Sequence, residues 1–340
     1  MSKNKILLLF TNHRVAEKLW PIIPKLSSAY YLDLFMVGLM SYDTPWVGDI
    51  DERRTMVNLY EEYFDNVIIG PGVKYHGDTI TDDLLKYIDL DEYSLVIFDD
   101  NRAVPEFNIP AFYKECKLKG IKVIGNSHGN EDAPHNAIGI SHDYQMNFIT
   151  GGIPANDTLK NVTLGQKHIL VIANFLGNRH SIYPVNFDRN FVHESGILDM
   201  SIEYDLPIKV KIKTRLDNPD YKQSINYVKQ LIECDVVANT EDIDQLIADS
   251  ALVISAPSTL AFKPIQLGIP TVLIKGSGAV GVFKEYPGLV ELNKKLIFDN
   301  LQMQIDHGRY TDFIEKNIAG GVTFKSAQTY VNYIKGGFDD

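Results

Sequence analysis

The chain has few cysteines, no long hydrophobic run and no excess of basic residues. Its two cysteines, Cys116 and Cys234, lie far apart among 340 residues and match no metal-binding spacing. A structural disulfide and a cysteine-rich zinc site are therefore not expected, and a reducing compartment is the simplest interpretation. The apolar run in the opening MSKNKILLLF is too short for a signal peptide core or a membrane span, so it predicts a first strand. We expect a cytoplasmic protein without a membrane-spanning segment.

The charge balance is acidic, with 33 basic and 44 acidic residues and a formal charge of −11. A surface that holds DNA or RNA by broad neutralisation of phosphates needs the opposite balance. A basic cleft confined to one face stays open. With 45% apolar and 23% charged residues, the composition predicts folded structure nearly end to end.

Short apolar runs rich in β-branched residues alternate with stretches of helical periodicity, which is typical of a parallel α/β sheet. Strands are predicted in the first half at 5–10, 31–39, 66–70, 94–100 and 121–126, and in the second half at 167–175, 206–214, 234–240, 251–257 and 270–276. Helices are predicted at 13–29, 110–120, 221–233, 243–249, 258–267 and 309–317. Pro21 and Pro24 must kink or split the first of these helices.

The pattern changes at 142–163, where a predicted strand is followed by Gly-Gly-Ile-Pro and a polar stretch. We interpret this segment as a hinge between an N-terminal domain at 1–155 and a C-terminal domain at 164–320, with a C-terminal helix at 321–340. Each half repeats the alternation of strand and helix. The predicted fold class is therefore α/β, with two Rossmann-like domains facing across a cleft.

The segment 242–278 carries the strongest chemical signal. A strand is expected to end at Ser255, after which Ser258 and Thr259 open a helix that stops at Gly268. Unpaired N–H groups and the positive end of the helix dipole would then lie at the carboxyl edge of the sheet, an arrangement that binds phosphate. The alternative is that Ser258 only caps the helix.

This segment resembles the nucleotide-binding half of the GT-B superfamily, which includes nucleotide-sugar glycosyltransferases, CDP-glycerol glycerophosphotransferases and UDP-GlcNAc 2-epimerases. Those proteins carry an acidic residue and the pattern l…ad.vis..St...a...g.P.v, in the order found here in Glu241, Leu246, Ala248, Asp249, Ser255, Ser258, Thr259, Gly268 and Pro270. NFITGGIPANDTLKN is similar to the GxPxxD passage that ends their first domain. IKVIGNSHGN falls where such families carry HG or HxEAG. The resemblance implies the GT-B fold.

The resemblance also implies a catalytic base. His128 occupies the HG position, and an imidazole with a pKa near neutrality suits the removal of a hydroxyl proton. Glu131 or Asp132 would orient the imidazole or share its role. The alternative is that Gly129 and Asn130 form a turn and that His128 is simply exposed.

Further candidates for donor binding come from basic and flexible positions. Lys213 and Arg215 continue one face of a strand, and at its carboxyl end they would neutralise a diphosphate. The alternative is that this segment is a solvent-exposed edge strand, whose lysines, Lys209, Lys211 and Lys213, prevent pairing with another chain. The other donor candidates are Arg179 in a loop cluster, Glu241 and Ser255 from the matched pattern, and Gly278 in a glycine-rich loop. Acceptor candidates follow the first and fourth strands: Asn12, His13, Arg14 and Asp100.

Two epimerase motifs lose their register in this chain. HRREN is replaced by NFLGNRH, and SGGxxEE by PSTLAFK, with Lys263 and Gln266 near the lost carboxylates. Epimerase activity is therefore disfavoured, and a retaining transferase that uses two glutamates has no support.

The leading prediction is a glycosyltransferase that moves a sugar from a nucleotide-diphosphate donor, such as a UDP sugar, to a hydroxyl acceptor. It would need no metal and no cofactor, because helix dipole and basic side chains stabilise the leaving diphosphate. The sequence does not decide whether the acceptor is a saccharide, a lipid-linked glycan or a modified nucleic-acid base. It also leaves open whether the protein forms a homodimer. The alternatives are a CDP-glycerol-type glycerophosphotransferase, an epimerase-like enzyme and a non-catalytic nucleotide-sugar binding protein.

Overall fold

The computed structural model divides the chain into two compact units. Unit 1 comprises Met1–Asp157 and Lys325–Asp340, and unit 2 comprises Thr158–Phe324. Of the predicted C-terminal helix at 321–340, residues 325–340 belong to unit 1 and residues 321–324 to unit 2. The structure describes residues 4–10, 19–36, 55, 57–69, 84–98, 109–125, 154–173, 175–176, 186–212, 221–237, 242–275 and 281–339.

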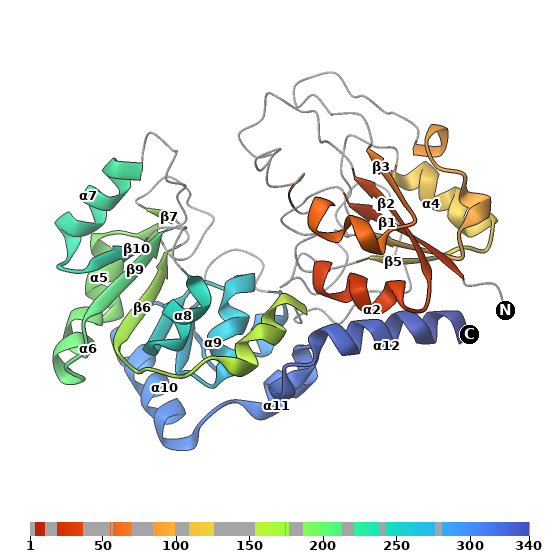
Figure 1. Ribbon diagram of the computed structural model, residues 1–340. Coiled ribbons are helices and arrows are strands. Elements are labelled where there is room, and N and C mark those ends of the chain that lie inside the picture. Colours follow the sequence, from red (N-terminus) through yellow and green to blue (C-terminus); the bar gives the residue numbers. More distant parts are fainter. Residues whose placement is uncertain are drawn as a thin grey trace. The chain divides into compact units, whose positions relative to one another are not determined.

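Unit 1 is built on a parallel sheet of five strands in the order β3-β2-β1-β4-β5 (Figure 1). The strands are β1 (Lys5–Phe10), β2 (Tyr31–Met36), β3 (Asn66–Ile69), β4 (Leu95–Phe98) and β5 (Lys122–Gly125). The order reverses between β1 and β4, which is the topological switch point of a doubly wound sheet. All five strands lie within the predicted ranges. The prediction was based on runs of apolar residues, and these residues are largely buried in the sheet.

The helical segments of unit 1 are short. They are η1 (Trp20–Ile22), α2 (Ile23–Ser27), η2 (Glu61–Tyr63), η3 (Leu84–Lys86), η4 (Leu90–Glu92), α4 (Ile109–Leu118) and α12 (Ser326–Asp339). Pro21 and Pro24 split the first helix into η1 and α2, and each proline lies within the first two positions of its segment, where a missing N–H costs nothing. α12 packs against η1. Trp20 is buried against Phe10 and stacks on Tyr60.

Unit 2 contains a parallel sheet of six strands in the order β10-β9-β6-β11-β12-β13. These strands are β6 (His168–Ala173), β9 (Ile208–Ile212), β10 (Asp235–Val237), β11 (Ser250–Ser255), β12 (Thr271–Ile274) and β13 (Leu289–Val290). β7 (Phe175–Leu176) and β8 (Asn186–Phe187) form a separate pair. The order reverses between β6 and β11, so the switch point of this unit lies beside β11.

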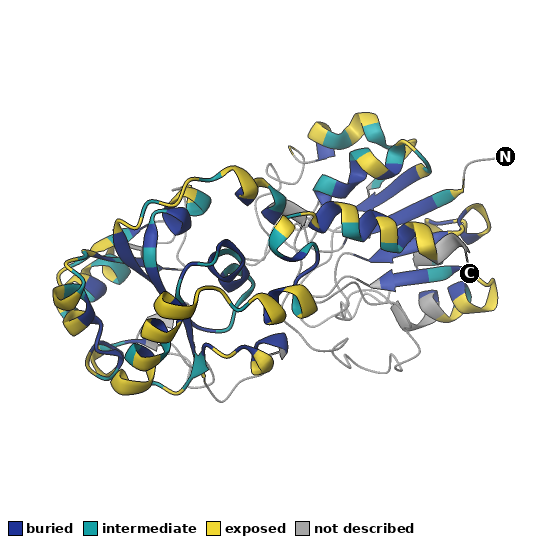
Figure 2. Ribbon diagram, turned by 90° about the horizontal axis from the view of Figure 1, so that it is seen from below, coloured by how far each residue is buried: buried dark blue, intermediate teal, exposed yellow. Residues whose placement is uncertain are grey.

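Helices connect the strands of unit 2. They are η5 (Pro154–Asn161, which begins in unit 1), α5 (Arg189–Ser195), α6 (Ile197–Glu203), α7 (Tyr221–Leu231), α8 (Ile243–Ala248), η7 (Thr259–Ala261), α9 (Phe262–Leu267), η8 (Gly281–Glu285), α10 (Lys294–His307), α11 (Thr311–Asn317) and η9 (Gly321–Thr323). The strand residues are largely buried, whereas the outward faces of the helices are exposed (Figure 2). Among the described residues, no helix is long and apolar enough to cross a membrane.

Candidate functional site

The switch point of unit 2 lies at the carboxyl ends of β6 and β11. Ser255, the last residue of β11, pairs with Ile172 of β6 on one side and with Leu273 of β12 on the other. Ligands of open α/β sheets bind outside the carboxyl ends of the strands at this reversal. The short connection from Ser255 to the next helix therefore borders the expected ligand position of this unit.

Ser255 itself is closed off. Its side chain is fully buried, and its hydroxyl donates to the carbonyl oxygen of Ala256 at 2.9 Å. The residue ends the strand and stabilises the turn that follows. Its predicted contact with a donor stays a prediction.

Ser258 precedes a continuous helical stretch formed by η7 and α9. Its backbone is extended, with φ −155° and ψ 160°, and its carbonyl accepts from the N–H of Ala261. Its hydroxyl makes no capping hydrogen bond to the helix. The Oγ atom is buried and has no hydrogen-bond partner in the part of the chain that the structure describes. The alternative that the side chain merely caps the helix does not match this geometry.

A buried hydroxyl without a partner is uncommon, because it forfeits the hydrogen bonds it would make to water. Here it stands at the start of a helical stretch, where the helix dipole has its positive end. Thr259 follows it and is half-buried. The switch-point loop thus offers donors for an oxyanion at the position where the topology expects a ligand.

Two side chains that replace carboxylates of the epimerase motif are used in packing. Lys263 of α9 forms an ion pair with Asp244 of α8. Gln266 is buried, and its amide donates to the carbonyl oxygen of Gly321 at 2.7 Å. These contacts tie α9 to its neighbours. Neither residue stands in for a catalytic carboxylate.

The lysines of β9 alternate with buried residues. Ile208, Val210 and Ile212 are buried, while Lys209 and Lys211 are partly exposed on the other face. β9 lies between β10 and β6, so it is not an edge strand, and the alternative of lysines guarding an edge is wrong for this strand. Lys213 and Arg215, the two predicted donor ligands, follow β9 and lie outside the described residues.

Most predicted site residues fall outside the described residues. The predicted catalytic residues His128, Glu131 and Asp132 are among them, and so are the predicted acceptor residues Asn12, His13, Arg14 and Asp100. The same holds for five donor candidates: Arg179, Glu241, Gly278 and, as stated above, Lys213 and Arg215. In unit 1, β1, β4 and β5 end at Phe10, Phe98 and Gly125, so the acceptor candidates and His128 follow strand ends on one edge of the sheet.

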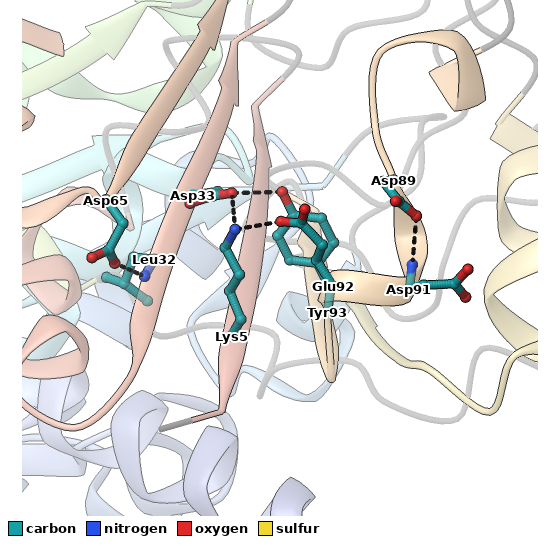
Figure 3. Close-up of polar contacts among 8 residues, drawn as sticks. All are labelled: Lys5, Leu32, Asp33, Asp65, Asp89, Asp91, Glu92 and Tyr93. Atoms are coloured by element: carbon teal, nitrogen blue, oxygen red, sulfur yellow. Dashed lines mark hydrogen bonds and ion pairs between the residues drawn. The ribbon is translucent and has the colours of Figure 1, made fainter. Parts of the chain in front are cut away.

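A buried polar cluster lies near the opposite, amino edge of the unit 1 sheet (Figure 3). Asp33 is buried, accepts from the Tyr93 hydroxyl at 2.6 Å and pairs with the Lys5 ammonium at 2.8 Å. Lys5 also pairs with Glu92 at 2.6 Å. Burial and the hydrogen bond to Asp33 raise the pKa of Tyr93. Burial acts to lower the pKa of Lys5, but its hydrogen bonds to Asp33 and Glu92 raise it on balance.

This cluster was not anticipated from the sequence, although an aspartate within an apolar strand is a visible signal. Because it lies away from the strand ends that precede the acceptor candidates, we assign it to stability. Within the described part of the chain, no group of three or more histidine, cysteine or acidic residues is placed to hold a metal ion. The absence of a metal from the reaction stays a prediction.

Comparison with known proteins identifies the architecture. No protein-family model matches the chain, and no curated protein is significantly similar in sequence. The UDP-GlcNAc 2-epimerase from Methanocaldococcus jannaschii matches with a TM-score of 0.60 and 13% identity, over 98% of this chain and 99% of that one. The UDP-GlcNAc 2-epimerase from Neisseria meningitidis bound to UDP-GlcNAc matches with a TM-score of 0.58 and 12% identity, over 98% of this chain and 100% of that one.

The chain has the GT-B fold. A third similar structure, the S. aureus MnaA–UDP co-structure, matches with a TM-score of 0.57 and 13% identity, over 99% of this chain and 97% of that one. The predicted fold class, α/β with two Rossmann-like domains of GT-B type, is confirmed. The TM-scores establish the fold, but sequence identities of 12 to 13% are too low to establish the activity.

Proposed function

We propose that this protein is a GT-B glycosyltransferase that moves a sugar from a nucleotide-diphosphate donor to a hydroxyl acceptor. The observation that carries the proposal is the buried hydroxyl of Ser258 at the switch point of unit 2, which has no hydrogen-bond partner among the described residues. A diphosphate oxygen would accept a hydrogen bond from this hydroxyl and would lie at the positive end of the helix dipole. Two of the structures with this fold are described as bound to UDP-GlcNAc or UDP, which supports a uridine nucleotide as the first donor to test.

The reaction needs a base for the acceptor and charge stabilisation for the leaving diphosphate. We assign the base to His128, with Glu131 or Asp132 orienting it. Developing negative charge would be stabilised by the Ser258–Thr259 helix start together with Lys213 and Arg215. The sequence of α9, FKPIQL, contains no carboxylate of the epimerase type, and its Lys263 and Gln266 bond Asp244 and Gly321 instead. This difference favours transfer over epimerisation.

Ligand-induced stabilisation tests the donor site. UDP and UDP sugars should raise the melting temperature, since a ligand at 100 times its Kd adds about 2.7 kcal/mol. Ser258→Ala should weaken binding by roughly tenfold or more, because it removes a hydrogen bond to a charged group. Ser201→Ala is the matched control: it removes a hydroxyl of α6 that donates to Leu206 at 2.6 Å, and it should leave the affinity unchanged. Equal affinities in both variants would contradict the donor site.

A panel of donors offered with acceptors then separates the activities. Release of UDP or GDP supports sugar transfer. Release of CMP from CDP-glycerol would instead identify a glycerophosphotransferase, and an altered sugar without nucleotide release would identify an epimerase-like enzyme. Nucleotide binding without turnover across many acceptors would identify a non-catalytic binding protein.

The role of His128 is tested once a substrate pair is known. His128→Ala should abolish most turnover while leaving donor binding intact, because general base catalysis contributes roughly 100- to 10,000-fold. His307→Ala, which alters an exposed histidine of α10, is the control and should retain full activity. Full activity of His128→Ala would refute its assignment as the base.

A further inference from the structure

Lys263 of α9 is a lysine that the fold has largely covered. Its side chain is only 16% exposed, and its ammonium pairs with the carboxylate of Asp244 on α8, whose side chain is 27% exposed. Lysine side chains are mostly exposed in folded proteins, because burial removes the water that solvates the ammonium. Within the described residues, Asp244 is the only acceptor that contacts this ammonium, which carries three N–H donors. The positive charge is thus held in place with donors left for a further acceptor.

The partner carboxylate is fixed by the start of its own helix. Asp242 caps α8 and accepts from the backbone N–H of Asp244 at 3.0 Å and from that of Gln245 at 3.1 Å. Asp244 therefore lies in the first turn of α8, and α8 packs against α9 (Figure 1). A carboxylate on a capped first turn holds the ammonium of Lys263 in one place.

The ion pair belongs to the edge of the unit 2 sheet at which a ligand is expected. α8 follows β10, and the helical stretch of η7 and α9 follows β11. The chain leaves each parallel strand at its carboxyl end, so both helices begin near the carboxyl edge of the sheet. Ligands of open α/β sheets bind outside this edge.

Within its own helix, Lys263 shares a face with Thr259, which opens η7 four residues earlier. Side chains four residues apart lie on one face of a helix and lean toward its N-terminus. Four residues rise by about 6 Å, which a lysine side chain can span. The ammonium therefore lies near the level of the helix start, at the end where the hydroxyl of Ser258 has no partner among the described residues.

We propose that Lys263 is a phosphate-binding residue of the donor site and that Asp244 positions it. The inference rests on the proposed function and adds a cation to the hydroxyls of Ser258 and Thr259. Lys263 donates to a phosphate oxygen with the N–H groups that Asp244 leaves unused. Asp244 keeps the ammonium in place, but its negative charge at the same time weakens the attraction of the site for an anion. The site thereby distinguishes a nucleoside diphosphate from a nucleoside.

Calorimetric titration of the full chain with UDP, GDP and CDP and with the matching nucleosides tests the role of Lys263. Lys263→Met keeps most of the side-chain length and removes the charge. It should weaken binding of the preferred diphosphate by roughly tenfold or more, because a hydrogen bond between charged groups is lost. The affinity for the nucleoside should stay the same, since it has no phosphate.

Asp244→Asn gives an effect of the opposite sign. The amide retains an acceptor oxygen for Lys263 and removes a negative charge near the phosphate. The diphosphate should therefore bind more tightly, by roughly threefold or more. An ion pair that only stabilises the fold predicts no gain in affinity, so an unchanged or lower affinity in this variant would overturn the positioning role.

The double variant Lys263→Met/Asp244→Asn keeps the test decisive if Lys263→Met fails to fold. It leaves no unpaired carboxylate on α8. Compared with Asp244→Asn alone, it should lose roughly tenfold or more in diphosphate affinity. Equal affinities in these two variants would count against Lys263.

The matched control is the ion pair of Lys294 on α10 with Asp199 on α6, at 2.7 Å. α6 and α10 contribute to the core cluster that contains Val171, whereas α8 and α9 contribute to the one that contains Leu170. Successive residues of a strand face opposite sides of the sheet, so the control pair lies on the other face. Lys294→Met and Asp199→Asn should leave the diphosphate affinity unchanged.

The titrations also separate this inference from the proposed function. Diphosphate binding that Ser258→Ala weakens and Lys263→Met leaves unchanged would keep the donor site and overturn the role of Lys263. Failure of the parent protein to bind UDP, GDP and CDP would refute both.

Discussion

The two edges of the unit 2 sheet are built differently. At the amino edge, the first residues of the strands have their polar groups paired: Gln304 bonds both the N–H and the carbonyl of Thr271, and Ser250 bonds His168. At the carboxyl edge, the hydroxyl of Ser258 is buried and has no partner in the described part of the chain. These strand starts are paired by other parts of the chain, whereas the Ser258 hydroxyl is a donor that no described residue uses. The difference teaches that the amino edge serves stability, whereas the carboxyl edge is where we propose that the donor binds.

The largest expected effect is at the amino edge. Gln304→Leu keeps the volume of the side chain but leaves the N–H of Thr271 without the acceptor that lies at 2.9 Å. The carbonyl of Thr271 retains the Tyr286 hydroxyl, so one buried donor is orphaned, at a cost of about 2 kcal/mol in the free energy of unfolding. Urea denaturation measures the loss. Gln302→Leu, on the exposed side of α10, should change stability little, and equal losses in both variants would break the comparison.

A smaller loss is expected where α9 ends. Gly268 has φ +77°, and an added Cβ would lie 2.9 Å from Nε of Arg309, whose guanidinium donates to the carbonyls of Gln266 and Leu267. Gly268→Ala should therefore cost about 1 to 2 kcal/mol. Gly336→Ala in α12 has free space around the Cβ, and it should instead stabilise by roughly 0.5 kcal/mol. Thermal unfolding that shifts both variants in the same direction would contradict this assignment.

Acid pH should weaken the amino edge through His168. Burial, reinforced by the charge of Lys209, lowers the pKa of His168, against a smaller opposing effect of Asp249. The unfolded chain then binds a proton more readily than the folded one, so this contribution is intact above pH 6.5 and is lost as the pH falls below that value. Urea midpoints at pH 7.5 and 5.5 should differ less in His168→Gln than in the parent protein. His307→Gln, at an exposed position, should keep the parent difference.

The smallest effect on stability is expected at the carboxyl edge. Ser258→Ala removes a hydroxyl that has no partner among the described residues, so it should change the free energy of unfolding by less than about 0.5 kcal/mol. Calorimetry without ligand checks this. A loss as large as that of Gln304→Leu would mean that Ser258 has a structural partner, and the contrast between the two edges would fail.

Much of this fold was predictable from local sequence. The strand at 5–10 and the split of the first helix follow from a buried apolar run and from two prolines, which act within their own segment. β13 was missed because it has two residues and is defined only by pairing with β12. α10 was missed as well, and with it the role of Gln304, since nothing near position 304 indicates Thr271 as its partner.

Prediction of the candidate site was similarly divided. Ser258 was found from its place between an apolar run and a helix, a local signal. Other properties of the site depend on neighbours distant in sequence. Among the described residues the Ser258 hydroxyl has no partner, Lys263 pairs with Asp244, and Gln266 bonds Gly321. The assignments of His128 and of the other candidates outside the described residues stay predictions.

By itself, the sequence determined the alternation of strands and helices, the division into two Rossmann-like halves and the place where a phosphate-binding turn was to be sought. These properties depend on hydrophobic periodicity and on glycine, proline and serine acting over a few residues. Only the tertiary structure decided which polar groups are paired, such as Gln304 with Thr271. Hydrogen bonds between distant segments depend on where folding brings those segments, and no local pattern encodes that position.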